Sequence, residues 1–133
     1  MKFAGLGLAA VMAVGLTGCV ITPKDVDAEP VFSEFTVDEP ISDLYYRLTS
    51  NQSENEFCNQ IHKPMFYPDR GQFRIYYGST QFGMNGVSPL MLASIHGQAV
   101  GDKTKLVMRE ANIVKEGTVA EVLTNFIKTG VCE

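Results

Sequence analysis

The pair of residues in this chain that most suggests catalysis is Cys58 and His62. They stand four positions apart, and His96 and Asp102 follow later in the chain. A histidine that takes the proton of a thiol creates a thiolate nucleophile, so a Cys–His pair is typical of thiol hydrolases. The same side chains are zinc ligands, but two histidines and one free cysteine make a thin ligand set.

Other catalytic or ligand-binding patterns are missing from the sequence. The glycines between residues 78 and 86 lack the spacing of a phosphate-binding loop, and no Lys-Ser/Thr pair follows them. No Gly-x-Ser-x-Gly elbow occurs, and no carboxylates are grouped for acid–base work. We therefore predict no catalytic residues, no metal and no non-covalent cofactor.

Charge weighs against nucleic acid as a partner. The 133 residues include 11 basic and 15 acidic side chains, which give a formal net charge of -4. Proteins that bind nucleic acid usually carry a basic surplus. The remaining composition, with 45% hydrophobic residues, is ordinary for a globular protein.

The N-terminus has the parts of an export signal. Lys2 precedes an uncharged run over residues 3–19 that is rich in Ala, Gly, Val, Leu and Met. Its strongly apolar part, residues 3–16, is shorter than the roughly 20 residues that a transmembrane helix needs. The run ends in a tetrapeptide that resembles the lipobox of bacterial lipoproteins, Leu16-Thr17-Gly18-Cys19.

This resemblance implies a covalent lipid on Cys19. A diacylglycerol is attached to the thiol, the lipoprotein signal peptidase cuts between Gly18 and Cys19, and many Gram-negative bacteria then acylate the new amine. Each buried methylene contributes about 0.8 kcal/mol, so two or three chains hold permanently. Val20, not Asp, follows Cys19. In the family's sorting rule this favours the outer membrane, facing the periplasm. An ordinary secretory leader with an incidental cysteine is the alternative.

With Cys19 acylated, two cysteines remain, Cys58 and Cys132. An even remainder in an oxidising compartment predicts one disulfide. A bridge across so long a loop stabilises the fold by roughly 4 kcal/mol in the chain-entropy model. The alternatives are two buried free thiols or a reactive thiol at Cys58.

We predict three parts along the chain. Residues 1–18 are the signal peptide, residues 19–33 are the lipidated cysteine and a flexible acidic tether, and residues 34–133 are a single domain. Pro23 and Pro30 interrupt the tether, and its acidic side chains keep it too polar to order itself.

Two amphipathic helices are predicted in the domain. Apolar residues at helical spacing over residues 41–48 predict a helix from about 40 to 50. The final segment begins with Thr118 and Glu121, which fit a capping box, and Gly130 is placed to end this helix in a left-handed conformation.

The strands are predicted from alternation and turn residues. A first strand opens the domain near residues 32–37. An edge strand at 65–67, strands at 73–77, 90–95 and 106–113, and an Asn85-Gly86 turn then form an antiparallel meander. The order β-α-(β)-β-β-β-α predicts an α+β two-layer sandwich with both helices on one face of the sheet.

Three tyrosines are candidates for binding a partner: Tyr46, Tyr67 and Tyr76. Each belongs to a pair of adjacent aromatic residues, and neighbours on a strand face opposite ways. Exposed tyrosine suits partner binding because it buries much area at little cost in entropy. Core packing with edge decoration is the alternative.

These observations favour a membrane-anchored lipoprotein of the bacterial envelope, facing the periplasm. Its expected role is non-enzymatic: binding, an adaptor function or envelope assembly, with an envelope protein as partner. One alternative is an envelope hydrolase of the peptidoglycan type that uses Cys58 and a histidine. The other is a lipoprotein that inhibits, or gives immunity to, a secreted toxin. The layout resembles that of many small Gram-negative lipoproteins, a likeness that transfers no functional residues.

Overall fold

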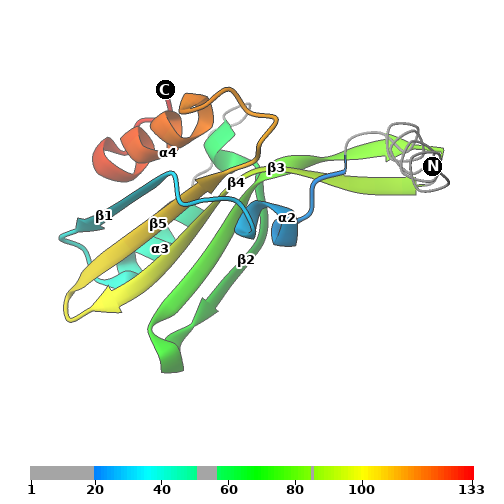
Figure 1. Cartoon of the computed structure of the whole chain (residues 1–133). Coiled ribbons are helices and arrows are strands. Elements are labelled where there is room, and N and C mark those ends of the chain that lie inside the picture. Colours follow the sequence, from blue (N-terminus) through cyan, green and yellow to red (C-terminus); the bar gives the residue numbers. More distant parts are fainter. Residues whose placement is uncertain (1–19, 51–56, 85) are drawn as a thin grey trace, which may run out of the picture.

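The computed structural model describes residues 20–50, 57–84 and 86–133. An antiparallel five-stranded sheet forms its centre, with strand order β1-β5-β4-β3-β2 (Figure 1). The strands are β1 (Ser33–Val37), β2 (Ile61–Tyr67), β3 (Gln72–Gly83), β4 (Gly86–Val100) and β5 (Lys103–Glu110). The predicted α+β class and the meander, here β2 to β5, are confirmed.

Both predicted amphipathic helices pack on one face of this sheet. They are α3 (Ile41–Thr49) and α4 (Thr118–Thr129). The helical spacing of their apolar residues brings buried side chains of both helices against alternate residues of β3, β4 and β5. Burial of each large apolar side chain contributes about 1.5–3 kcal/mol to the stability of the fold. The main members of this core are Leu44, Leu48, Phe73, Ile75, Tyr77, Ile95, Leu106, Met108, Leu123 and Ile127.

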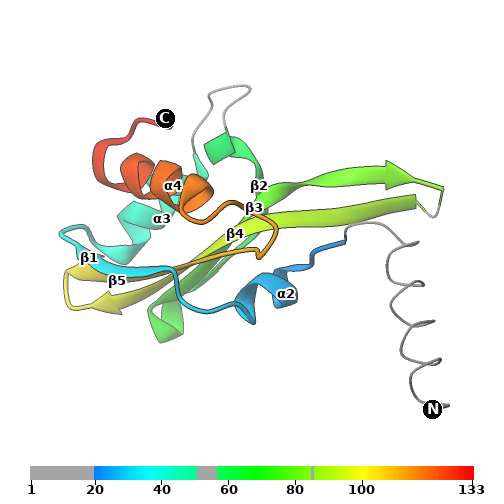
Figure 2. The same ribbon diagram turned by 45° about the horizontal axis from the view of Figure 1, so that its top comes forward.

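The prediction of a flexible tether is wrong for the described residues of that segment. They contain a short helix, α2 (Pro23–Asp27), which lies on the opposite face of the sheet (Figure 2). A capping box starts it, because the Thr22 side chain accepts from the Asp25 N–H and the Asp25 carboxylate accepts from the Thr22 N–H. Val26 is fully buried beside Met91. The segment is polar overall, and Val26 is the one fully buried apolar residue among its described positions.

The start of α4 also differs from the prediction. Thr118 lies inside the helix, and the N-cap is Gly117. This glycine has a left-handed conformation and no side chain that could cap the helix. The Glu110 carboxylate at the end of β5 instead accepts from the N–H groups of Gly117, Val119 and Ala120, at 2.8–3.0 Å. The predicted end of the helix is confirmed, because Gly130 is left-handed with φ 80°.

The predicted disulfide joins Cys58 to Cys132. Cys58 is buried in the short 3-10 helix η1 (Phe57–Asn59), just before β2, and Cys132 follows α4. The bridge therefore ties the C-terminus to the start of the meander. A second 3-10 turn, η2 (Pro68–Arg70), links β2 to β3.

Strands β3 and β4 continue well beyond the rest of the sheet. Their pairing runs outward to Gly83 and Gly86, whereas β2 reaches only Tyr77 on β3 and β5 reaches only Ala93 on β4. Residues 78–91 therefore form a two-stranded projection, the hairpin arm (Figure 1, Figure 2). The predicted strands were too short here because Gly, Ser and Thr interrupt the apolar alternation. Asn85 of the predicted turn lies outside the described residues.

Candidate functional site

A cluster of polar side chains lies where α2 meets the sheet. The Tyr76 hydroxyl donates to Asp27 Oδ2 at 2.6 Å, and His96 Nε2 lies 2.9 Å from Asp27 Oδ1. A carboxylate only accepts, so Nε2 carries the ring proton and donates it. We call these three residues the Asp27 cluster. It joins the last residue of α2 to neighbouring strands β3 and β4.

Burial dominates the electrostatics of the cluster. It raises the pKa of Tyr76 to about 12, with a further contribution from the hydrogen bond and charge of Asp27. Burial also lowers the pKa of His96, and this effect exceeds the opposite effect of Asp27. At neutral pH two neutral donors therefore face one carboxylate, an arrangement that satisfies all three groups where α2 docks.

The cluster contains an Asp–His pair, but its hydrogen bonds join α2 to the sheet and do not match those of a catalytic triad. In serine hydrolases the carboxylate binds Nδ1, and Nε2 is left to face the nucleophile. Here Asp27 occupies Nε2 of His96. Ser94, which precedes His96 by two residues on β4, has a buried hydroxyl that makes no hydrogen bond within the described part of the chain. The contacts of the cluster thus hold α2 on the sheet.

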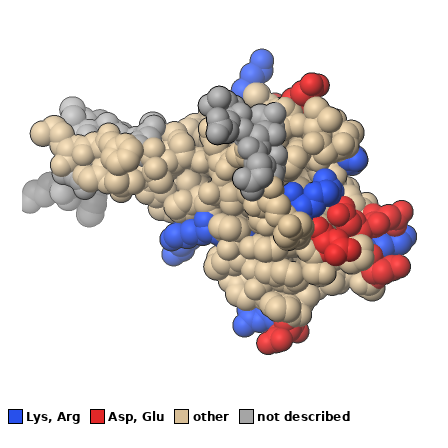
Figure 3. All heavy atoms as spheres, turned by 180° about the vertical axis from the view of Figure 1, so that it is seen from behind, with Lys and Arg blue, Asp and Glu red and all other residues tan. Residues whose placement is uncertain are grey.

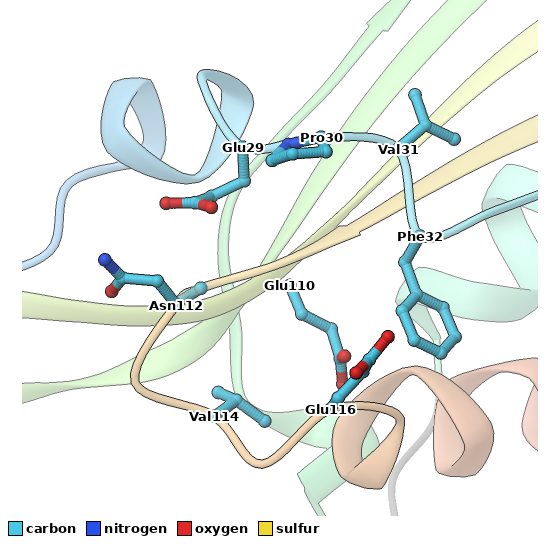
Figure 4. Close-up of a pocket in the computed structure, with 9 residues that line it drawn as sticks. Glu29, Pro30, Val31, Phe32, Glu110, Asn112, Val114 and Glu116 are labelled. Carbon is cyan, nitrogen blue, oxygen red and sulfur yellow. The ribbon is translucent and has the colours of Figure 1, made fainter.

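A hollow of about 510 Å³ lies beside α2, between the segment leading into β1 and the segment leading into α4 (Figure 4). Its acidic side chains are Glu29, Glu110 and Glu116, and its lining contains no lysine or arginine. The Glu110 carboxylate is already used by the backbone at the start of α4. Arg109 Nε donates to the Glu29 carbonyl at 3.1 Å and fixes the upper wall. The lining disfavours an anionic ligand.

A second hollow of about 510 Å³ runs between edge strand β1 and α4. Phe32 and Phe35 supply apolar surface on the strand side, and Thr124 and Lys128 line the helix side. The Lys128 ammonium lies 4.9 Å from the centroid of the Phe35 ring, a cation–π contact. We call this the β1–α4 groove. Sequence reasoning missed it because its two walls are about 90 residues apart in the chain.

The predicted Cys–His pair has no nucleophile in this fold. Cys58 is in the disulfide and in the core beneath the helices, so it has no free thiol. His62 lies on β2, shortly after Cys58 in the chain. His96 lies on the α2 side of the sheet, and Asp102 is exposed in the turn between β4 and β5. Within the described residues, no three His, Cys, Asp or Glu side chains are grouped to hold a metal.

The three candidate tyrosines do not form one surface. Tyr46 is 73% exposed on α3. Tyr67 is half-buried at the end of β2, where Arg70 stacks on its ring. Tyr76 is only 3% exposed, so the prediction that it faces a partner is wrong. Its neighbour Tyr77 is buried too, in the core beneath α3 and α4, whereas α2 covers Tyr76 on the opposite face of the sheet.

Gly18 and Cys19, the predicted cleavage and lipidation residues, lie outside the described residues. None of the described helices is both long and apolar enough to cross a bilayer. Asp27, which the sequence analysis assigned to the tether, was missed as a site residue. The Thr22-Pro23-x-Asp25 capping pattern was the sequence signal for the helix that presents it.

No family model, no curated protein and no solved structure matches this chain.

Proposed function

We propose that this chain is a bacterial lipoprotein, held to the outer membrane by acyl chains on Cys19, whose α+β domain is a binding or adaptor module facing the periplasm. The lipobox-like tetrapeptide over residues 16–19, directly after an export-type leader, carries this proposal. The disulfide supports it, since such bridges persist in oxidising compartments.

The docking of α2 adds a mechanical consequence to the proposal. The described chain starts at Val20, and Ile21 forms a parallel bridge to Leu90 of β4. The distance from the acylated cysteine to the folded domain is therefore one or two residues, and not the length of a tether. Such an anchor presents the domain close to the bilayer and in a restricted orientation.

The intact mass of the protein extracted from membranes tests the anchor. We expect a chain that begins at Cys19 and carries a diacylglycerol together with an N-linked acyl chain. The Cys58→Ala/Cys132→Ala variant keeps Cys19 and should carry the same lipid, whereas Cys19→Ala should carry none. A wild-type chain with an unmodified N-terminus at Met1 would contradict the proposal.

For the module itself, the β1–α4 groove is the surface that best supports binding of a protein partner. β1 has a paired neighbour on one side only within the described sheet. The Ser33 hydroxyl beside the groove is buried and has no hydrogen-bond partner among the residues that the structure describes. An extended peptide that adds to a free strand edge gains backbone hydrogen bonds, and the apolar side chains alongside supply selectivity.

Photo-crosslinking in cells tests this surface. A photoreactive residue at Thr124, in the groove, should give a discrete adduct that competition by excess unlabelled protein removes. The same residue at Tyr46, exposed on α3, is the matched control. An adduct from position 46 and none from position 124 would move the binding surface to α3.

A further inference from the structure

The hairpin arm carries no charged residue. No Asp, Glu, Lys or Arg occurs between Arg74 and Asp102, a stretch that contains the whole arm, all of β4 and β3 from Ile75 onward. Seen from behind in Figure 3, the arm is the extension at the left, and its described atoms are free of both charge colours, whereas charges cover much of the opposite end. The least charged part of the molecule is thus also its most protruding part.

The end of the arm exposes large apolar side chains. Phe82 is 85% exposed, Met84 is fully exposed and Val87 is 58% exposed. In the described structure no helix lies over this end, since contacts of α2 with β4 are made near Met91. Apolar side chains gathered on an exposed projection mark an interaction surface more often than chance decoration.

The chain that leads to Cys19 lies along this arm. The Ile21 N–H donates to the Pro89 carbonyl at 3.2 Å, and the Met91 N–H donates to the Ile21 carbonyl at 2.9 Å, a parallel bridge to Leu90. Because β4 runs from the arm's end toward the sheet, parallel pairing places Val20 on the side of Ile21 that faces that end. Cys19 is the next residue in the sequence, so the proposed acylation site is only two residues from the bridge to the arm.

We infer that the end of the hairpin arm is a membrane-contacting element, in which Phe82, Met84 and Val87 enter the interface of the leaflet that holds the lipid of Cys19. This inference rests on the proposed anchor, which brings the arm to the bilayer. A strand edge with unpaired backbone groups does not enter the hydrocarbon core, so the contact is limited to the headgroup and upper acyl region. The absence of charge removes the repulsion that an acidic arm would meet at anionic headgroups.

Tryptophan fluorescence tests the inference, because the chain contains no tryptophan. The full lipidated protein carrying Met84→Trp is reconstituted into vesicles of phosphatidylethanolamine and phosphatidylglycerol, with doxyl-labelled lipid as quencher. The matched control is Tyr46→Trp, a similarly exposed position on α3. We expect blue-shifted emission and at least twofold stronger quenching for Trp at position 84 than at position 46, with little dependence on salt.

Three outcomes separate the two proposals. Failure of the protein to float with the vesicles overturns the anchor, and the inference with it. Flotation with equal quenching at both positions overturns the inference alone. Emission that is blue-shifted at position 84 but not quenched by doxyl lipid shows that protein covers the arm, which also overturns it.

A further variant checks that the new tryptophan does not insert by itself. Phe82→Glu in the Met84→Trp background places a charge beside the reporter without touching the core, since Phe82 is exposed. We expect this change to lower the quenching to the level of position 46 while flotation persists. Unchanged quenching would show that the tryptophan alone creates the contact and would overturn the inference.

Discussion

At the scale of single residues, two carboxylates accept hydrogen bonds that hold elements together, and no sequence pattern around them predicts this role. Glu110 ends a strand and caps a helix, and Asp27 ends one helix and accepts from two strands. In both cases a buried or half-buried acceptor is matched to donors from other elements of the fold. A carboxylate that is removed from water is costly unless hydrogen-bond donors face it in this way.

Replacing Glu110 should destabilise the protein more than replacing Glu121, which the sequence suggested as the capping residue. Glu110→Ala leaves three backbone N–H groups at the start of α4 without an acceptor, so we expect a loss of about 2 kcal/mol in the free energy of unfolding. Glu121→Ala alters an exposed side chain and should cost under about 0.5 kcal/mol. Urea denaturation measures both, and the reverse order would contradict this account of the cap.

Acid should weaken the protein in part through His96. Burial lowers the pKa of His96 in the folded state, so the unfolded chain takes up its proton at a higher pH than the folded chain does. This contribution to stability is complete above the unfolded pKa of about 6.5 and is lost as the pH falls from there through the lower folded pKa.

The His96→Gln variant isolates this effect. Its unfolding midpoint in urea should fall less than that of the wild type between pH 7.5 and pH 5.5, because glutamine does not titrate. Equal slopes for the two proteins would show that protonation of His96 is not coupled to folding.

At the scale of elements, α2 changes how the molecule is understood. It covers part of the face of the sheet opposite α3 and α4, removes Tyr76 from solvent and lies next to Ile21, whose bridge to Leu90 fixes the start of the described chain. A helix of five residues is not stable on its own in water. Its stability comes from Val26, the Asp27 cluster and the bond from Arg109 to the Glu29 carbonyl.

Val26→Asp should release α2 while the core under α3 and α4 stays folded. Burial of the valine side chain contributes about 1.5 kcal/mol or more, so its loss raises the open population at least about tenfold. Cleavage by trypsin after Lys24 reports the opening and should accelerate by that factor. Ala28→Asp, two residues away and exposed, is the control and should leave the cleavage rate near that of the wild type. Equal acceleration in both variants would contradict the docking.

At the scale of the whole molecule, one covalent link and one projection define the architecture. The disulfide spans 74 positions and joins the C-terminus to the start of the meander, which places β2 to β5 and α4 in one covalent loop. The hairpin arm and the exit of the chain toward Cys19 share the other end (Figure 2). In the proposed anchoring, the first of these ends faces the membrane, and the rest of the molecule carries the helices and the β1–α4 groove.

Removing the disulfide should cost about 4 kcal/mol, because the bridge limits the conformations of a long unfolded loop. The Cys58→Ala/Cys132→Ala variant tests this by urea denaturation, with the wild type in its oxidised form as reference. The deletion leaves small vacancies only, so most of the loss arises from the unfolded state. Equal stability of the two proteins would show that the bridge does not constrain the unfolded chain.

The sequence predicts the strands and the two amphipathic helices because their signals are local. It predicts the disulfide because only two cysteines remain when Cys19 is acylated. Helical spacing over residues 41–48, alternation over 73–77 and the left-handed Gly130 each report on a few neighbouring residues. The lipobox resemblance at Cys19 is also local, and it remains a prediction.

Only the tertiary structure decided what pairs at long range. The docking of α2 and the burial of Tyr76 depend on partners that are distant in the chain. The capping of α4 by Glu110 and the extension of β3 and β4 into an arm involve nearer residues, but they depend on where the strands end in space. In the sequence Val26 is an isolated apolar residue, and only its packing against the sheet shows that it is buried. Hydrophobic burial and hydrogen bonding act on neighbours in space, and a pattern in the sequence reports only neighbours along the chain.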